Sequence, residues 1–107
     1  MKLAASNIGW ESKDDAAVYA RMKALGFSGL EIAPTRLVSG QPYDPANSRL
    51  AASLSAEISE TWGLRICSMQ SIWYGLTERI FGSEEERDFL LRYTRAAVGN
   101  GPDIGAP

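Results

Sequence analysis

A repeated succession of helix, glycine and strand is the feature that most constrains the fold of this chain. Two strand-like segments begin 35 residues apart, at Gly29 and Leu64, and each follows a helix-like segment that ends in glycine, at Gly26 and Gly63. A third strand-like segment, Lys2–Ile8, precedes the first helix. Strands that are joined by a crossover helix pair in parallel with right-handed connections. The sequence therefore predicts a parallel α/β sheet with helices on one or both of its faces.

The expected elements alternate in the order β-α-β-α-β-α. Strands are predicted at Lys2–Ile8, Gly29–Thr35 and Leu64–Ile72. Each helix is expected to begin at an N-cap serine: Ser12, Ser48 and Ser83. The last of these is the clearest, because Ser83 and Glu86 match a capping box. In the second helix, four apolar residues are spaced four apart on one face: Leu50, Leu54, Ile58 and Trp62. The long segment 36–47, between the second strand and the second helix, is predicted to be a loop.

Three units are too few to close a barrel. Eight units of this length would need about 280 residues, near the size typical of a barrel of eight alternating strands and helices. An arc of three strands leaves two edges with unpaired backbone groups, and ordering it costs about 1 to 2 kcal/mol per residue in backbone entropy. We therefore expect an incomplete barrel or a small open sheet over residues 1–98. Residues 99–107, rich in Gly and Pro, are expected to form a disordered tail with no hydrophobic face to bury.

Composition excludes several classes of function. The 11 basic and 13 acidic residues are spread along the chain, so no basic surface is expected to bind nucleic acid. The chain has no His and one Cys, which excludes Ser-His-Asp and Cys-His catalysis and an internal disulfide. That residue, Cys67, is expected to be buried and inert. No apolar run reaches the roughly 18 residues that cross a bilayer, and no secretory signal begins the chain, so we expect a cytoplasmic protein without membrane contact.

Polar side chains near the carboxyl ends of the predicted strands are candidates for ligand binding. Glu31 lies between apolar neighbours, and it either lines a ligand site or forms a salt bridge with Arg36 or Arg65. Gln70 can donate to one sugar hydroxyl while it accepts from another; alternatively, it caps loop backbone. Strict alternation places three side chains of the third strand on one face: Ile66, Ser68 and Gln70.

Asn7 lies at the end of the first predicted strand, at a level equivalent to Gln70, and three aromatic residues follow strand ends: Trp10, Trp73 and Tyr74. The flat face of Trp10 or Trp73 can form a wall against the apolar face of a sugar ring. Large aromatic side chains also pack under loops, where they supply ordinary core area. The sequence leaves both interpretations open.

Three segments resemble the amino-terminal part of sugar phosphate isomerase/epimerase-like proteins with the xylose isomerase-like TIM barrel: KLAASNIGW, MKALGFSGLEIAPTRL and the run from AEISETWGL to RYTRAAV. GFSGLEI, SMQS and FGSEEER are their most specific parts. The similarity extends over residues 2–98 and covers roughly the first third of such a barrel. It implies an incomplete TIM barrel of three βα units, derived from a metal-dependent isomerase or epimerase of sugars or sugar phosphates.

The resemblance also implies which groups are absent. In the family, a divalent metal, Mn²⁺ or Mg²⁺, is held by Glu, Asp and His side chains from later strands. We therefore expect no metal to bind this chain alone, and little or no catalysis without a Lewis acid. The resemblance also implies four positions of this chain that face the substrate: Glu31 and Gln70 at the rim of the barrel, with Trp10 and Trp73 as walls of the site.

The sequence departs from the family pattern at Gly99, where the last helix would continue and lead into a fourth strand. This departure predicts a truncated or frame-shifted product that is not catalytic by itself. The alternative is a non-catalytic binding or assembly module that self-associates through its open strand edges.

Overall fold

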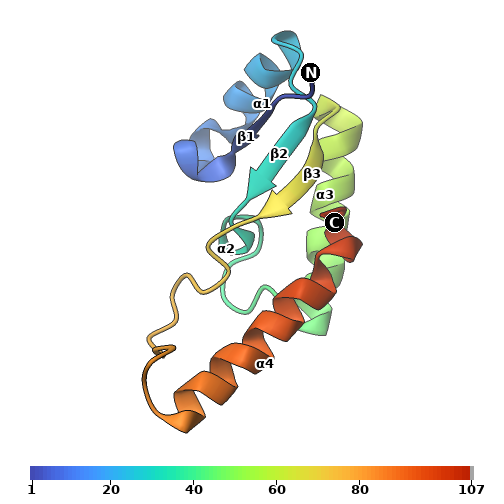
Figure 1. Cartoon of the computed structure of the whole chain (residues 1–107). Helices are drawn as coiled ribbons and strands as arrows, with labels where there is room; N and C mark the ends of the chain where they lie inside the picture. The colour runs from blue at the N-terminus through green and yellow to red at the C-terminus, as the bar shows by residue number, and fades with distance from the viewer. Residues whose placement is uncertain (107) are drawn as a thin grey trace.

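The computed structural model describes residues 1–106 as an α/β fold around a three-stranded parallel sheet (Figure 1). The strands, in the order β1-β2-β3 across the sheet, are β1 (Ala4–Ser6), β2 (Gly29–Ile32) and β3 (Arg65–Met69). The helices are α1 (Asp15–Ala24), α2 (Pro34–Leu37), α3 (Pro45–Trp62) and α4 (Glu84–Asn100). Short 3-10 turns are η1 (Asn7–Gly9), η2 (Ser12–Asp14) and η3 (Pro102–Ile104). The parallel α/β arrangement is confirmed, and the sheet is not closed.

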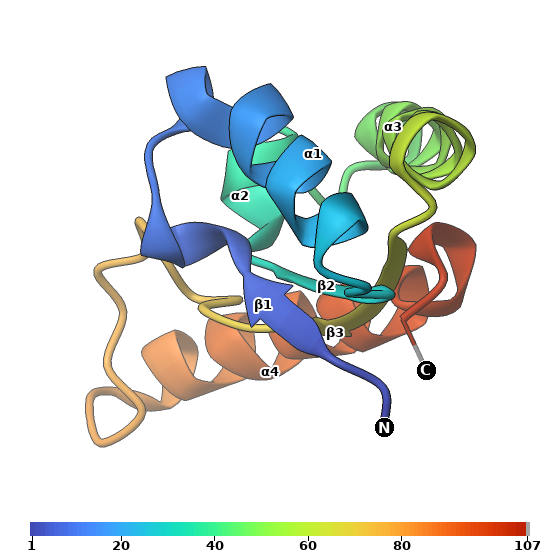
Figure 2. The same ribbon diagram turned by 90° about the horizontal axis from the view of Figure 1, so that it is seen from above.

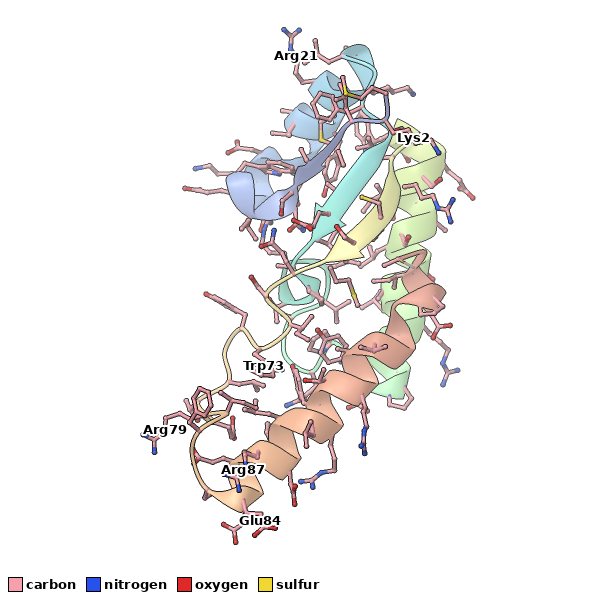
Figure 3. All side chains as sticks on the ribbon, in the orientation of Figure 1. Lys2, Arg21, Trp73, Arg79, Glu84 and Arg87 are labelled. Atoms are coloured by element: carbon pink, nitrogen blue, oxygen red, sulfur yellow. The ribbon has the colours of Figure 1, made fainter. Side chains whose placement is uncertain are left out.

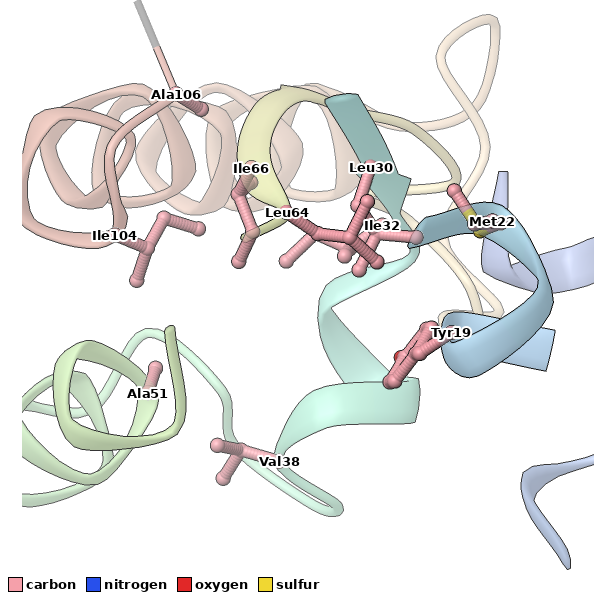
Figure 4. Packing of buried hydrophobic residues seen from close by; sticks show 10 residues of the cluster. All are labelled: Tyr19, Met22, Leu30, Ile32, Val38, Ala51, Leu64, Ile66, Ile104 and Ala106. Carbon is pink, nitrogen blue, oxygen red and sulfur yellow. The ribbon is translucent and has the colours of Figure 1, made fainter. Parts of the chain in front are cut away.

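The core lies between one face of the sheet and the helices α1, α2 and α3, which Figure 2 shows together on that side. Leu30 and Ile32 of β2 are fully buried there, while Glu31 between them points to the opposite face. Figure 4 shows these two with the other buried members of the same core cluster: Tyr19, Met22, Val38, Ala51, Leu64, Ile66, Ile104 and Ala106. The alternation predicted for the second strand is thus confirmed. On the opposite side Figure 2 shows only α4, most of which lies beyond the carboxyl ends of the strands in Figure 1, so we call this side of the sheet the open face.

Local signals at several helix ends are confirmed. After α1, the N–H of Gly26 donates to Lys23 and that of Phe27 to Met22, while Gly26 has a φ of 77°. This pattern is a Schellman motif, in which a left-handed glycine ends the helix. At the start of α4, the Ser83 hydroxyl accepts from the Glu86 N–H and the Glu86 carboxylate accepts from the Ser83 N–H. The predicted capping box is therefore present.

Other predicted boundaries are wrong. Ser12 begins η2 rather than capping α1, and α3 begins at Pro45, because proline fits the first position of a helix. Ser48 lies inside α3 and donates its hydroxyl to Asn100 Oδ1 at 2.7 Å. Pro34 begins α2 within the predicted second strand and first loop, again as the first helical residue.

The apolar face of α3 also differs in part from the prediction. Leu50 is 48% exposed, and its neighbour Ala51 is buried in the core. Leu54, Ile58 and Trp62 pack against the core as expected.

Residues 99–106 differ from the expectation of a tail with nothing to bury. Gly99 and Asn100 complete α4, and the chain then turns through η3. Ile104 and Ala106 are only 4% and 3% exposed, and both belong to the core. Ile104 lies beside α3, and Ala106 lies near β3 and the last turns of α4, so a segment of low overall hydrophobicity still contributes buried surface. Pro107 lies outside the described residues.

The chain is elongated, with a radius of gyration of 14.7 Å and extents of 48 × 28 × 24 Å. A compact domain of this size has a radius near 13 Å. Figure 1 shows the reason: α4 extends beyond the carboxyl ends of the strands. Within residues 1–106, no helix has the length and apolar character that a membrane crossing requires.

Candidate polar site on the open face of the sheet

A β-bulge in β3 decides which side chains reach the open face. Leu30 pairs with Ile66 but Glu31 pairs with Ser68, so Cys67 is an extra residue in β3. The next pair, Ile32 and Met69, returns to the covered face, where Met69 packs against the core. The prediction that Ile66 shares a face with Ser68 is therefore wrong, because the bulge interrupts the alternation between them.

Four polar side chains form a hydrogen-bonded group near the carboxyl ends of the three strands. The Ser68 hydroxyl donates to Glu31 Oε2 at 2.7 Å, and Gln70 Nε2 donates to Glu31 Oε1 at 2.7 Å. The same Gln70 amide also donates to the hydroxyl of Ser6. We call Ser6, Glu31, Ser68 and Gln70 the open-face cluster. It joins β1, β2 and β3 across the face opposite α1, α2 and α3.

The partners of Glu31 settle one of the alternatives left open by the sequence. Its two carboxylate oxygens accept hydrogen bonds from a hydroxyl and an amide, and within residues 1–106 neither Arg36 nor Arg65 pairs with it. The salt-bridge interpretation is wrong because Arg36 is directed to Asp15, with an N to O distance of 3.0 Å. Glu31 is half-buried and is stabilised by neutral donors instead.

Asn7 and Arg36 fix the strand ends that carry the cluster. Asn7 is 3% exposed, and its Oδ1 accepts from the Ala33 N–H at 2.9 Å. The Arg36 guanidinium donates to the carbonyl of Asn7 through Nε (3.1 Å) and Nη2 (2.7 Å), and to the carbonyl of Trp10 at 3.1 Å. These bonds hold the end of β1 against the end of β2. Sequence reasoning considered Arg36 only as a partner of Glu31 and missed this positioning role.

The two tryptophans make contacts away from the cluster. Trp10 donates its indole N–H to Asp15 at 2.7 Å and packs edge-on against Tyr19, with ring centroids 6.2 Å apart. Trp73 lies in the loop before α4 (Figure 3), where it is 39% exposed and donates to Thr94 Oγ1 at 2.8 Å. The structure therefore brings Glu31 and Gln70 together and places Trp10 and Trp73 in contacts that support loops.

Two residues beside the cluster have properties that the sequence did not indicate. Cys67 is exposed, contrary to the expectation of a buried residue, because alternation after the buried Ile66 turns its side chain to the open face, where a Cβ on Gly29 would lie 3.1 Å from its sulfur. Ser71 has a φ of 54°, an unusual backbone conformation for a serine. It turns the chain directly after Gln70 and so directs the following loop away from the sheet.

The shifted pKa values have local structural causes. Burial, with a smaller contribution from the charge of Asp15, raises the pKa of Tyr19 to about 12. The hydrogen bond from the Ser83 N–H lowers the pKa of Glu86, as expected for the carboxylate of a capping box. Burial also raises the pKa of Tyr43, whose ring packs against Tyr93 with centroids 5.0 Å apart.

The open-face cluster does not fit a divalent metal. It supplies a single carboxylate, and Mn²⁺ and Mg²⁺ are bound through several oxygen ligands. Both oxygens of Glu31 already accept hydrogen bonds, and the Gln70 amide presents N–H groups that repel a cation. No group of three His, Cys, Asp or Glu side chains within residues 1–106 could hold a metal ion. What the cluster offers is hydrogen bonding: hydroxyls that donate and accept, an amide and a carboxylate.

Comparison of the chain with models of protein families, with curated proteins and with solved structures finds no match. The family resemblance of the sequence therefore stays a prediction. The geometry of the open-face cluster is the structural basis on which a function can be proposed.

Proposed function

We propose that this chain is the amino-terminal part, three βα units long, of a xylose isomerase-like TIM barrel from a metal-dependent sugar or sugar-phosphate isomerase or epimerase. The open-face cluster carries the proposal. In a closed barrel of parallel strands, the face opposite the helices is the barrel interior, and ligands bind at the carboxyl ends of the strands. Ser6, Glu31, Ser68 and Gln70 lie at that end and on that face.

The chemistry of the cluster suits a polyhydroxylated ligand. A carboxylate accepts hydrogen bonds from hydroxyl groups, and the Gln70 amide can accept through its oxygen as well as donate through its nitrogen. In this role Glu31 and Gln70 bind and orient sugar hydroxyls at one side of a site. The other side, together with any metal ligands, would come from strands that the three units do not contain.

We further propose that the chain is not catalytic by itself. The described side chains do not fit the divalent metal of the family, and Glu31 is the single carboxylate of the open-face cluster, where its hydrogen-bond partners are Ser68 and Gln70. The three-stranded sheet also leaves one side of the cluster open to solvent, where water competes for every hydrogen bond.

The experiment is a titration of the ¹⁵N-labelled chain with a panel of ketopentoses, ketohexoses and their phosphates, followed by NMR. Weak binding is expected, with chemical-shift changes centred on residues 6, 31, 68 and 70. Glu31→Gln should abolish these changes, while the control Glu60→Gln, which alters an exposed carboxylate on α3, should leave them intact. A panel without any shift at the cluster would contradict the rim assignment.

An activity assay tests the second part. The purified chain is incubated with the same panel and with Mn²⁺ or Mg²⁺, and no isomerisation or epimerisation above background is expected. Robust metal-dependent turnover that disappears in Glu31→Gln would show that the isolated chain is a competent enzyme, against the proposal.

A second candidate is a non-catalytic assembly module. It is favoured by the open sheet, in which β1 and β3 each have a strand neighbour on one side only. Light scattering coupled to gel filtration separates the two: a discrete oligomer with cooperative melting, and no response to sugars, would favour assembly.

A further inference from the structure

β3 is an edge strand whose outer side carries backbone groups available for pairing. The N–H of Arg65 donates to the Ser28 carbonyl, and the N–H of Gln70 donates to the Ile32 carbonyl, both at 2.9 Å. In a strand, the backbone groups of successive residues point to opposite sides. Ile66, which comes after Arg65, therefore directs its N–H and C=O away from β2, toward the free edge.

The carboxyl-terminal segment lies against this free edge. We call residues 101–106 the strap. A Cβ on Gly105 would lie 3.7 Å from the Ile66 carbonyl oxygen, so the strap backbone runs directly beside the outward-facing group of β3. Farther along the edge, Gly101 and Ala106 line a hollow together with residues of β3 and α4: Cys67, Ser68, Met69, Ala97 and Val98.

The strap is fastened from the side of α3 and the core. The Ser55 hydroxyl on α3 donates to the Ile104 carbonyl at 2.7 Å, and the Ile104 side chain enters the core together with Ala106 (Figure 4). The Gly101 carbonyl accepts from the N–H groups of both Ile104 (3.2 Å) and Ala106 (2.9 Å), which closes the turn. Gly105 completes it with a φ of 88°, a conformation that side chains other than glycine rarely adopt.

We propose that the strap masks the β3 edge and prevents it from pairing with the β3 edge of a second copy of this chain. Native proteins commonly cover an edge strand with a loop, because an exposed edge is a template for association. A second copy of this chain is the partner that the strap excludes from the β3 edge. Two identical edges can pair antiparallel about a two-fold axis, and the backbone groups of each edge then form hydrogen bonds with those of the other. This masking does not depend on the proposed function; it restricts self-association of the intact chain to the edge of β1.

The position of Cys67 supplies a reporter for this pairing. Cys67 is the central residue of β3 and the single cysteine of the chain. In an antiparallel pair centred on it, the two Cα atoms would be about 4.5 to 5.5 Å apart, within the range that a disulfide requires. Mild oxidation therefore links two chains when their β3 edges pair.

The experiment compares the full chain with variants that loosen the strap. Ile104→Asp removes its core anchor, Gly105→Val strains its left-handed residue, and Leu50→Asp is a control at a 48% exposed position on α3. We expect the wild type and Leu50→Asp to crosslink slowly through Cys67 and to show the same size as each other by light scattering, because neither exposes the β3 edge. Ile104→Asp and Gly105→Val should form dimers or larger species, with the Cys67 disulfide forming about tenfold faster.

Ser55→Ala covers the case in which the stronger variants lose their fold, because it removes one hydrogen bond to the strap and leaves the core side chains in place. Circular dichroism verifies its helix content. Faster crosslinking of a folded Ser55→Ala supports the proposal. Unchanged crosslinking in folded strap variants, or rapid Cys67 crosslinking in the wild type, overturns it.

Discussion

Glu31→Gln tests whether the hydrogen bonds of the open-face cluster stabilise the fold. The change removes the charge and keeps the shape of the side chain. The oxygen of the new amide can accept from Ser68 or from Gln70, and its NH₂ group then faces the other donor. At least one hydrogen bond to a charged acceptor is therefore lost. Such bonds contribute about 1.5 to 3 kcal/mol, and because Glu31 is half-buried we expect a loss of about 2 kcal/mol in the free energy of unfolding.

The assay is urea unfolding at pH 7, followed by the fluorescence of the three tryptophans and by circular dichroism. A loss of this size is readily measured against a total stability of about 5 to 15 kcal/mol. Glu60→Gln on α3 is the matched control: its carboxylate is exposed, and the change should stay within about 0.5 kcal/mol of the wild type. The double variant Glu31→Gln/Gln70→Ala should cost less than the sum of the single changes, with a coupling of about 1 kcal/mol.

A Glu31→Gln variant as stable as the wild type, or more stable, would refute this reasoning. It would mean that the hydrogen bonds from Ser68 and Gln70 do not compensate the desolvation of the carboxylate, so that the charge of Glu31 lowers the free energy of unfolding. Zero coupling between Glu31 and Gln70 would refute it as well, because the 2.7 Å contact would then contribute nothing.

Three further predictions concern the surroundings of the cluster and the helices. Arg36→Ala should lower the free energy of unfolding by about 2 to 4 kcal/mol in urea, because two carbonyls lose their donor and Asp15 loses its ion-pair partner. Ser83→Ala should cost about 1 kcal/mol, measured as a lower melting temperature, because the N-cap bond to the Glu86 N–H disappears. The raised pKa of Tyr19 contributes stability that is complete below pH 10 and is lost as the pH rises through about 12. The free energy of unfolding of Tyr19→Phe should therefore fall less steeply than that of the wild type over this pH interval, as measured by urea unfolding at a series of pH values.

Each of these has a control. Arg36→Lys keeps the charge without the planar fork and should recover only part of the loss; full recovery would show that charge alone matters. Ser83→Asp restores a capping oxygen and should be close to the wild type, and an equal loss in both variants would argue against the cap. A Tyr19→Phe profile that is parallel to the wild type above pH 10 would contradict the burial argument.

Local signals made much of the fold predictable. The glycines after α1 and α3, the capping box at Ser83 and the alternation of Leu30, Glu31 and Ile32 all depend on residues close together in sequence. The pairing of Glu31 with Gln70 was not predicted as a contact, but both residues were selected because parallel strands bring their carboxyl ends together. Ser6 and Ser68 were missed as members of the cluster, since serine near a strand end has no distinctive pattern.

The sequence by itself determined the order of strands and helices, the parallel pairing that crossover helices impose, and the polar residues at the strand ends, because these depend on short-range stereochemistry and periodicity. The tertiary structure alone decided the bulge at Cys67, which brings Ser68 to Glu31, and the burial of Ile104 within a segment rich in Gly and Pro. Both depend on the fit between surfaces that are distant in sequence: β3 against β2, and the strap against α3 and the β3 edge. The average composition of such a segment conceals its single large apolar side chain. Burial of that side chain depends on the space that the tertiary structure leaves beside it.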